Sequence, residues 1–560
     1  MTKKFLSLII ILFFATAHKQ ALAENNYDKQ NHTTDSLLES LIQPKSPGFV
    51  VGIIKEGAFI YKRGFGLANI ERNEPITTTT VFDIASTSKQ FTSMAILLLQ
   101  QEGKLSLDDN VRKYIPELPK LKKPITIRHL LTHTSGYRDY GTLFVISGIS
   151  ESDITDKEDA LEIICAQKSL NFPTGTSWDY TNTGFFLASI LVERVSGLTL
   201  KEYTLKNIFE PLGMSHTFFL EDRITVVPNK ATGYSRNDEN EFTAESFNWQ
   251  INGDGGLQTT CEDLLLWDQN FYSPTVGGPN LIQELTQVVS LKNGYETNYG
   301  LGIFKEKHKG LEIQYHSGGI PGFRSEMLRF PSENFTVIFL SNYSDYEPTE
   351  IAFKISEIYL REKLIEPAAD TSASHYVKVP ITLPQLQSYT GYYRTESGDL
   401  VRQIKLENDA IWYVRNDWSK SELVYIGQHE FLMNVDGTFV KFNVETDSIQ
   451  SIDVISKGEN LAHLIPFNAI SIDSANFADV LGTYFSEELN SSLALYIENS
   501  SLFITSKKSQ IIIELQCMIA DNYSNTENGL TIQIERNKKN EVTGLFLNID
   551  RAVQNYFVRI

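Results

Sequence analysis

The chain has 560 residues, enough for two to four domains, and its 41% hydrophobic and 11% aromatic residues exclude a disordered chain. Lys and Arg number 50 against 69 Asp and Glu, which gives a net charge of −19. This negative charge argues against nucleic acid or an anionic membrane surface as the main partner.

The first 23 residues have the composition of an export signal. Lys3 and Lys4 precede the apolar residues 5–17, and the small residues of 21–23 form a cleavage pattern before Glu24. The apolar run is short for a membrane span, so we expect a signal peptide (1–23), a periplasmic or secreted protein and no stable membrane anchor. A retained anchor is the alternative.

Residues 24–365 mix helical and strand patterns. Residues 48–54 and 59–65 predict a strand hairpin, and residues 82–101 predict a helix that is buried, because 94–99 are apolar on every side. Further helices are expected at 36–42, 127–136, 185–195, 261–271 and 348–364, and further strands at 311–315, 323–330 and 336–342. Strands at both ends of this region predict an antiparallel sheet built from both, with a helical region inserted between them.

A polar linker, residues 366–383, separates this region from residues 384–560, where short alternating strands dominate. A weak repeat places Gly391 and Gly482, each beside aromatic residues, 91 residues apart. Two halves of about four strands each would close into one eight-stranded barrel. A two-sheet sandwich is the alternative.

Three cysteines, Cys165, Cys261 and Cys517, form neither a disulfide framework nor a zinc pattern. Cys165 and Cys261 could pair in an oxidising compartment, but spacing does not decide it. The histidines show no HxxxH or HxH spacing, so we expect no metal and no cofactor.

Ser86 and Lys89 stand three residues apart at the start of the helix predicted over 82–101. Positions i and i+3 share a helix face, so an amine would lie beside a hydroxyl. A hydroxyl becomes a nucleophile when a base lies next to it. Such a pair is common by chance, and two further motifs add weight to it.

The first of these motifs is Tyr180 and Asn182, a phenol and an amide in a loop before the helix predicted over 185–195. A phenol beside an ammonium can carry protons. The second is the segment 315–319, Tyr-His-Ser-Gly-Gly, which we expect to hold His316 on the exposed face of a strand end. Its glycines would let a substrate lie along the backbone.

In this order, the three motifs resemble those of the serine β-lactamase and penicillin-binding-protein group, over residues 37–364. The resemblance is to the class C β-lactamase and DD-peptidase branch, which includes D-aminopeptidases and related esterases. It implies an α/β (α+β) fold, an antiparallel sheet flanked by helices with an all-helical subdomain. The all-β C-terminal barrel that follows resembles a lipocalin-like domain.

The resemblance also implies roles for single residues. Ser86 is similar to the acylated nucleophile, Lys89 to its general base, and Tyr180 to the residue that returns the proton to the leaving group and later activates water. Asn182 resembles the residue that hydrogen-bonds both the lysine, here Lys89, and the amide of the substrate.

Residues His316, Ser317 and Gly318 take the place of the Lys-Thr-Gly segment of the family and would bind substrate. The backbone N–H groups of Ser86 and Gly319 would form the oxyanion hole.

Two positions depart from the family pattern. His316 replaces the lysine of true β-lactamases and would hold a substrate carboxylate less firmly near pH 7. Thr174 stands where a proline is usual, which should affect loop stiffness more than chemistry. His133, in the segment 130–136, has no spacing that pairs it with the serine, and we expect it to be a structural, hydrogen-bonded histidine.

The sequence therefore predicts an exported serine hydrolase that forms an acyl-serine on amides or esters and resembles a D-amino-acid peptidase or DD-peptidase. Its partner would be a small-molecule or peptide substrate, and the C-terminal region could mediate self-association. The alternatives are an esterase, a β-lactamase proper and a catalytically silent ligand-binding or scaffold protein.

Overall fold

The structure is a computed structural model that describes residues 27–560 apart from 293, 366–378, 397–399, 417–418, 434–437, 447, 457–458, 469–476, 507, 509–511, 520 and 526–527. The expected signal peptide and most of the expected linker lie outside the described residues. Two compact units form: one from residues up to 137 together with 151–366, the other from 138–150 together with 367–560.

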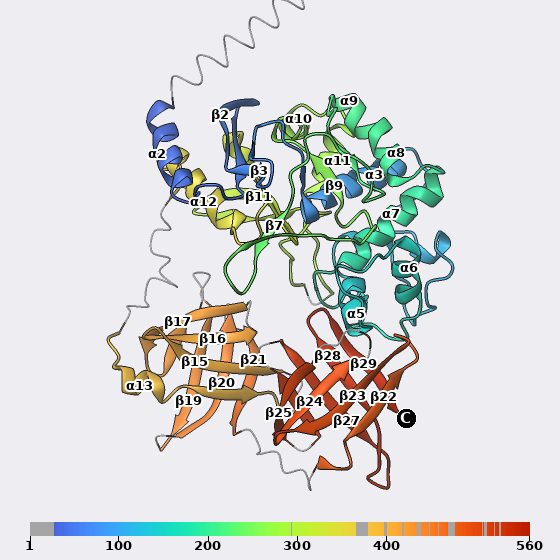
Figure 1. Cartoon of the computed structure of the whole chain (residues 1–560), viewed down its shortest axis with the longest axis vertical. Coiled ribbons are helices and arrows are strands. Elements are labelled where there is room, and N and C mark those ends of the chain that lie inside the picture. Colours follow the sequence, from blue (N-terminus) through green and yellow to red (C-terminus); the bar gives the residue numbers. More distant parts are fainter. Residues whose placement is uncertain are drawn as a thin grey trace, which may run out of the picture. The chain divides into compact units, whose positions relative to one another are not determined.

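A six-stranded antiparallel sheet forms the centre of the first unit, in the order β10-β11-β12-β13-β1-β2 (Figure 1). The two N-terminal strands pair with the later ones through β1 and β13, as predicted. The strands are β1 (Phe49–Lys55), β2 (Ala58–Phe65), β10 (Phe304–His308), β11 (Leu311–Ile320), β12 (Phe323–Phe330) and β13 (Phe335–Ser341).

Helices cover both faces of this sheet. Helices α2 (Asp28–Glu39) and α12 (Pro348–Tyr359) pack with an apolar cluster that includes Phe49 and Phe339. On the other face, α10 (Cys261–Tyr272) approaches so closely that a Cβ atom at Gly52 would lie 2.5 Å from the sulfur of Cys261. A central strand buried on both faces explains the unbroken apolar run of β1.

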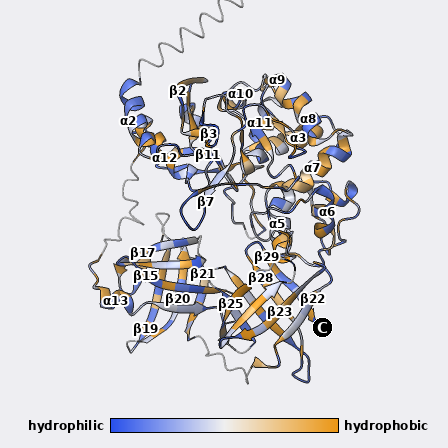
Figure 2. Cartoon of the chain, viewed as in Figure 1, coloured by the Kyte–Doolittle hydropathy of each residue, from blue (hydrophilic) through white to orange (hydrophobic). Residues whose placement is uncertain are grey.

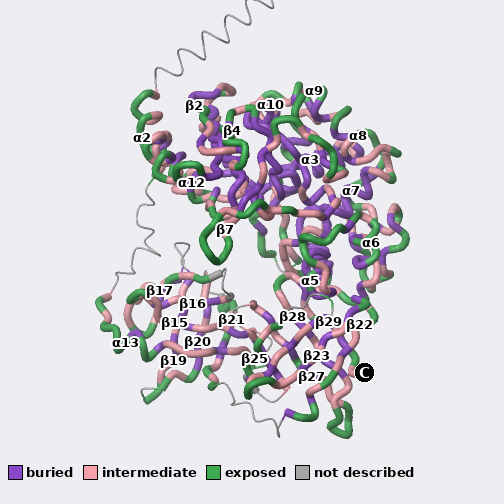
Figure 3. Tube along the Cα trace, in the orientation of Figure 1, coloured by how far each residue is buried: buried purple, intermediate pink, exposed green. Residues whose placement is uncertain are grey.

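The inserted region is mainly helical, and its centre is the 3₁₀ turn η1 (Ala85–Ser88) that continues as α3 (Lys89–Gln101). Figure 3 shows buried residues gathered along α3, and Met94 to Leu97 have no exposed surface, as predicted. The other helices of this unit are η2 (Val111–Lys113), α4 (Ile127–Leu131), α6 (Lys157–Cys165), α7 (Asn182–Ser196), α8 (Leu200–Thr204), the π-helix η3 (Leu205–Phe209), α9 (Glu210–Leu212), α11 (Gly278–Leu285) and η4 (Pro331–Glu333).

Short strands join the inserted region to the sheet. They are β3 (Leu67–Asn69), β4 (Glu74–Pro75), β5 (Phe82–Asp83), β6 (Phe218–Phe219), β7 (Tyr234–Arg236), β8 (Phe242–Ala244) and β9 (Leu257–Thr259). Among the described residues, no single helix has the length and apolar composition to cross a membrane, and only the bent pair 182–196 and 200–212 meets both. Cys165 and Cys261 are free thiols.

The C-terminal region forms two closed eight-stranded antiparallel barrels. The expectation of a single barrel with four strands from each half is therefore wrong, because each half closes on itself. The first barrel contains β14 (Gly391–Arg394), β15 (Val401–Glu407), β16 (Ala410–Asn416), β17 (Ser419–Gly427), β18 (Glu430–Leu432), β19 (Phe439–Glu445), β20 (Ser448–Ser456) and β21 (Glu459–Phe467), preceded by α13 (Leu383–Gln387).

The second barrel belongs to the same unit as α5 (Tyr140–Ile146), a helix in the much earlier segment 138–150. Its strands are β22 (Gly482–Ser486), β23 (Ser491–Glu498), β24 (Ser501–Ser506), β25 (Ile512–Ile519), β26 (Asn522–Asn525), β27 (Leu530–Arg536), β28 (Val542–Ile549) and β29 (Ala552–Arg559). Figure 2 shows hydrophobic and hydrophilic residues along the strands of this barrel. Burial alternates in these strands, and in β24 every second residue is buried. This period of two matches a barrel with a side-chain-filled interior.

The sequence repeat has a structural counterpart at the start of each barrel. The hydroxyl of Tyr393 donates to the carbonyl of Tyr389 at 2.9 Å, and that of Tyr484 donates to the carbonyl of Val480 at 2.6 Å. Both tyrosines are buried. Each hydrogen bond satisfies a buried phenol and fixes the first strand to the turn before it.

Candidate active site

Ser86 lies in a tight turn that exposes its side chain. Ala85 has a φ of 46°, and its N–H donates to the carboxylate of Asp83 at 2.9 Å. Every residue from 81 to 90 is buried except Ser86, which is half-buried. A left-handed conformation is costly for alanine, so this turn is held by its surroundings, as residues at functional sites often are.

Lys89 is completely buried, and its Nζ atom contacts three oxygen atoms. They are the Oγ of Ser86 at 2.9 Å, the Oδ1 of Asn182 at 2.9 Å and the carbonyl of Asp254 at 2.7 Å. The amide and carbonyl oxygens can only accept hydrogen bonds. The hydroxyl of Ser86, which can donate or accept, takes the third direction of the amine.

Asn182 reaches Lys89 because it is the first residue of α7. The preceding Thr181 caps the helix, and its hydroxyl accepts from the N–H of Thr183 at 3.2 Å. A Thr N-cap is a strong helix-start signal. The cap fixes where α7 begins and therefore directs Asn182 at Lys89.

The ring of Tyr180 lies over the same amine, with its centroid 5.0 Å from the Nζ of Lys89. Its hydroxyl is buried and has no hydrogen-bond partner within the described residues. Buried polar atoms are almost always hydrogen-bonded, so this phenol is suited to a partner that arrives with substrate or water.

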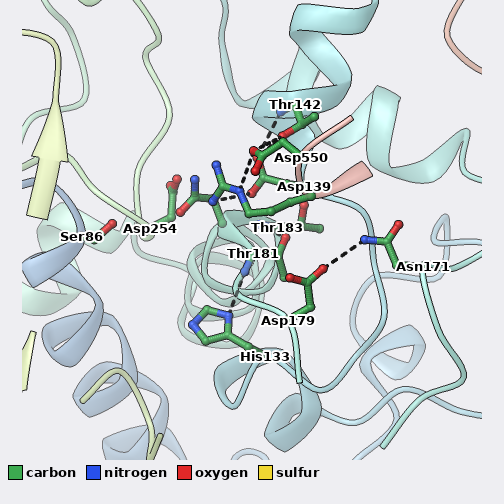
Figure 4. Close-up of polar contacts among 12 residues, drawn as sticks. Ser86, His133, Asp139, Thr142, Asn171, Asp179, Thr181, Thr183, Asp254 and Asp550 are labelled. Carbon is green, nitrogen blue, oxygen red and sulfur yellow. Dashed lines mark hydrogen bonds and ion pairs between the residues drawn. The ribbon is translucent and has the colours of Figure 1, made fainter. Parts of the chain in front are cut away.

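His133 contacts the loop that carries Tyr180 through hydrogen bonds and through its ring. It is fully buried, its Nδ1 accepts from the N–H of Thr181 at 3.2 Å, and its carbonyl accepts from the N–H of Asp179 at 3.0 Å (Figure 4). The rings of His133 and Tyr180 have centroids 4.3 Å apart. His133 is hydrogen-bonded, as predicted.

Strand β11 forms the wall of the site next to Ser86. A Cβ atom on Gly318 would lie 2.2 Å from the carbonyl oxygen of Ile84 and 3.0 Å from the backbone nitrogen of Ser86. The hydroxyl of Thr87 donates to the carbonyl of His316 at 3.0 Å and ties the turn to the strand. Only glycine at position 318 allows this approach.

The side chain of His316 is buried, at 2% exposure, so the expectation of an exposed face is wrong. Its Nε2 lies 2.9 Å from the hydroxyl of Tyr299, and its Nδ1 lies 2.6 Å from the carbonyl of Ser317. Burial, with a smaller effect from the charge of Lys89, lowers the pKa of His316 to about 3. The imidazole is neutral, with Nδ1–H donating to Ser317 and Nε2 accepting from Tyr299.

Sequence reasoning missed three contributors to the site. Tyr299 holds the imidazole, the backbone carbonyl of Asp254 holds Lys89, and the hydroxyl of Ser325 donates to the carbonyl of Ile84 at 2.7 Å. The only signals were a tyrosine before a glycine-rich turn at 300–302 and the Gly-Asp-Gly-Gly segment at 253–256. Neither pattern indicates which side chain or carbonyl faces the serine.

The fold and this site define a class of protein. A serine at a helix start, held by a buried lysine and bordered by a glycine-containing strand, is the arrangement of a serine hydrolase. The beta-lactamase family model matches residues 29–354, more than half of the chain, and the chain therefore belongs to the beta-lactamase family.

Two similar proteins extend the relationship beyond this domain. The chain is 28% identical to penicillin-binding protein 4* of Bacillus subtilis over 77% of its own length and 97% of that protein. It is 25% identical to a D-aminopeptidase of Brucella anthropi over 82% of each. Among solved structures, an octameric penicillin-binding protein homologue from Pyrococcus abyssi covers 85% of this chain and 99% of its own, with a TM-score of 0.54 and 23% identity.

Proposed function

We propose that this serine hydrolase forms an acyl-serine intermediate on amides or esters of D-amino acids or small acyl groups, as a D-amino-acid peptidase or a DD-peptidase-like enzyme would. The observation that carries the proposal is the 2.9 Å contact between the Nζ of Lys89 and the Oγ of Ser86. The similarity to a D-aminopeptidase and a penicillin-binding protein supports the substrate class.

In the first step, the Oγ of Ser86 attacks the substrate carbonyl while the Nζ of Lys89 takes its proton as general base. The oxygen of the tetrahedral intermediate is bound by the backbone N–H groups of Ser86 and Gly319. The C–N or C–O bond then breaks, and Tyr180 passes a proton to the leaving group, taking one from Lys89 in turn. In the second step the same groups deprotonate a water molecule, which attacks the carbonyl of the acyl-serine. The acid leaves, and the Oγ of Ser86 regains its proton.

The neutral His316 narrows the substrate class. Both of its ring nitrogens lie within hydrogen-bond distance of groups of the protein itself, Tyr299 and Ser317. A neutral imidazole held in this way gives a substrate carboxylate no opposite charge at this position. We therefore rank a β-lactamase proper below a D-amino-acid peptidase or an esterase.

Mass spectrometry of the acyl-enzyme tests this function. The protein is mixed with D-alanyl amides and peptides, simple esters and penicillin, and a mass increase on residues 82–90 is followed over time. We expect rapid turnover of an amide or ester, slower turnover of penicillin and no adduct in Ser86→Ala. An adduct that persists in Ser86→Ala, or that maps to another residue, would contradict the proposal.

Two further proposals concern location and assembly. We propose export with cleavage after Ala23, which N-terminal sequencing of protein from the cell envelope or medium would test by finding Glu24 first.

We also propose self-association through the C-terminal region, in view of the octameric Pyrococcus abyssi homologue. Light scattering of the purified protein would show a monomer if this second proposal is wrong.

A further inference from the structure

The second barrel holds a segment that lies more than 330 residues earlier in the chain. Residues 138–150, including α5 (Tyr140–Ile146), belong to the same compact unit as the barrel strands β22–β29. In Figure 1, α5 lies beside the ends of β28 and β29.

Arg138 is the first residue held by the barrel, and its side chain has no exposed surface. Its Nε donates to the carbonyl of Val553 at 2.8 Å and its Nη2 to the carbonyl of Gln554 at 3.0 Å. Its Nη1 pairs with the carboxylate of Glu488. Several donors of one guanidinium are thus used on the barrel, which gives the contact a fixed geometry.

Asp139 adds a second set of contacts. Its N–H donates to the carbonyl of Arg551 at 3.1 Å, and its carboxylate lies 3.6 Å from the guanidinium of the same residue. It also caps α5 by accepting from the N–H of Thr142, whose hydroxyl lies 3.3 Å from the carboxylate of Asp550 (Figure 4). The barrel therefore holds the residue that starts α5.

The far end of α5 also faces the barrel strands. Val145 and Ile146 border an apolar cavity whose other lining residues come from the barrel strands, among them Leu493, Ile504, Leu530 and Leu547. The hydroxyl of Ser491 donates to the carbonyl of Ser147 at 3.4 Å. The segment is thus held at its start by charged groups and near its end by the bond from Ser491 and the burial of Ile146.

The residues just before Arg138 hold the loop that carries Tyr180. The carbonyls of His133, Thr134 and Gly136 accept from the N–H groups of Asp179 at 3.0 Å, Gly175 at 2.9 Å and Asn171 at 2.8 Å. The carbonyl of Ser135 accepts from the hydroxyl of Thr174 at 3.0 Å. Four consecutive residues, 133–136, thus fix the Tyr180 loop along its length.

We propose that the second barrel is an intramolecular clamp for the Tyr180 loop, with Arg138 as its positioning residue. Only Tyr137 separates the barrel-held Arg138 from the loop-holding stretch 133–136, so fixing one end restrains the other through the backbone. The effect on catalysis rests on the proposed role of Tyr180, whereas the effect on loop motion does not. A small misplacement of a proton-transfer group can cost a large factor in rate.

The test compares Arg138→Met with Arg536→Met in the full-length protein. Arg536 is the matched control, because it pairs with Asp521 and Asp479 in the same unit, and within the described residues no bond joins it to 138–150. Hydrogen exchange of peptides covering residues 171–183 is measured together with the acylation step and the KM of D-alanyl amide hydrolysis. For Arg138→Met we expect about tenfold faster exchange and about tenfold slower acylation with KM nearly unchanged, and for Arg536→Met neither change.

A double-mutant cycle separates positioning from general loss of stability. If Arg138 acts through Tyr180, Arg138→Met should slow acylation much less in a Tyr180→Phe background than in the wild type. Equal slowing in both backgrounds, or wild-type exchange over 171–183, would overturn the clamp. Should Arg138→Met not fold, Glu488→Gln keeps the bonds to Val553 and Gln554 and weakens only the ion pair, with the same expected directions. If the wild type shows no acylation at all, the proposed function fails while the exchange measurement still decides the clamp.

Discussion

The Nζ of Lys89 lies 2.9 Å from the Oγ of Ser86 and is fully buried. Two acceptor oxygens, from Asn182 and Asp254, occupy its other directions. The amine therefore also lies within hydrogen-bond distance of the serine hydroxyl, the position that a general base for Ser86 requires.

Lys89→Met should remove the base while preserving the volume of the side chain. We expect the acylation rate with a fluorophosphonate to fall by about 10²–10⁴, the usual contribution of a positioned base. The matched control is Lys104→Met, a partly exposed lysine just beyond the other end of α3 that pairs with Glu102. A Lys89→Met rate within tenfold of the control would exclude Lys89 as the base.

Gly318→Ala should damage the site even though it adds only one methyl group. The added carbon would lie 2.2 Å from the carbonyl oxygen of Ile84, so β11 or the Ser86 turn must move. We expect a loss of about 100-fold in kcat/KM, comparable to the loss of an oxyanion donor. Gly319→Ala, where the nearest atom is the flexible end of Arg324 at 3.4 Å, should lose much less, and equal losses would contradict the steric argument.

His316 should remain neutral and in one tautomer across the physiological range, since burial lowers its pKa to about 3. Nitrogen-15 NMR of the imidazoles, with the His316→Gln spectrum for assignment, should show protonated Nδ1 and unprotonated Nε2 from pH 8 to 5. The ordinary pKa of a histidine in the unfolded chain is about 6.5. Between pH 6.5 and pH 3 the unfolded chain therefore binds a proton that the folded protein does not, and folding stability falls as the pH falls. A His316 signal that titrates above pH 5 would contradict the buried geometry.

Glu326 should make the protein less stable as pH rises. Its carboxyl group is buried in β12, and burial raises its pKa to about 7 despite hydrogen bonds from Thr349 and the N–H of Met327. Between an ordinary pKa near 4.3 and 7 the folded state retains a proton that the unfolded state loses, so folding stability falls over this window and stays lower above it.

Glu326→Gln removes that loss. Compared with the wild type, the variant should gain up to about 3 kcal/mol between pH 5 and pH 8 in the free energy of unfolding measured with urea. Glu312→Gln, a partly exposed carboxylate on β11 that pairs with Lys305, should show no such gain. A pH-independent difference between Glu326→Gln and the wild type would mean that Glu326 is ionised in the folded state.

Much of the hydrolase fold could be predicted because its signals are local. The apolar runs of β1 and α3, the alternation of β11 and the Thr N-cap of α7 each depend on neighbours a few residues away. The barrels were harder to predict, because their strands are short and similar. The 91-residue repeat identified two halves, but whether each half closes on itself depends on the pairing of its first and last strands, such as β22 with β29.

The sequence by itself determined the class of chemistry: Ser86 with Lys89, Tyr180 with Asn182, and the His-Ser-Gly-Gly segment are readable from residue type and spacing. Only the tertiary structure decided what surrounds them. An alternating strand reveals that His316 points to one face, but not that Tyr299 and the rest of the fold cover that face and keep the imidazole neutral. In the same way, no local pattern reveals that Arg138 is held by a barrel more than 330 residues later, because such contacts form only when distant segments pack together.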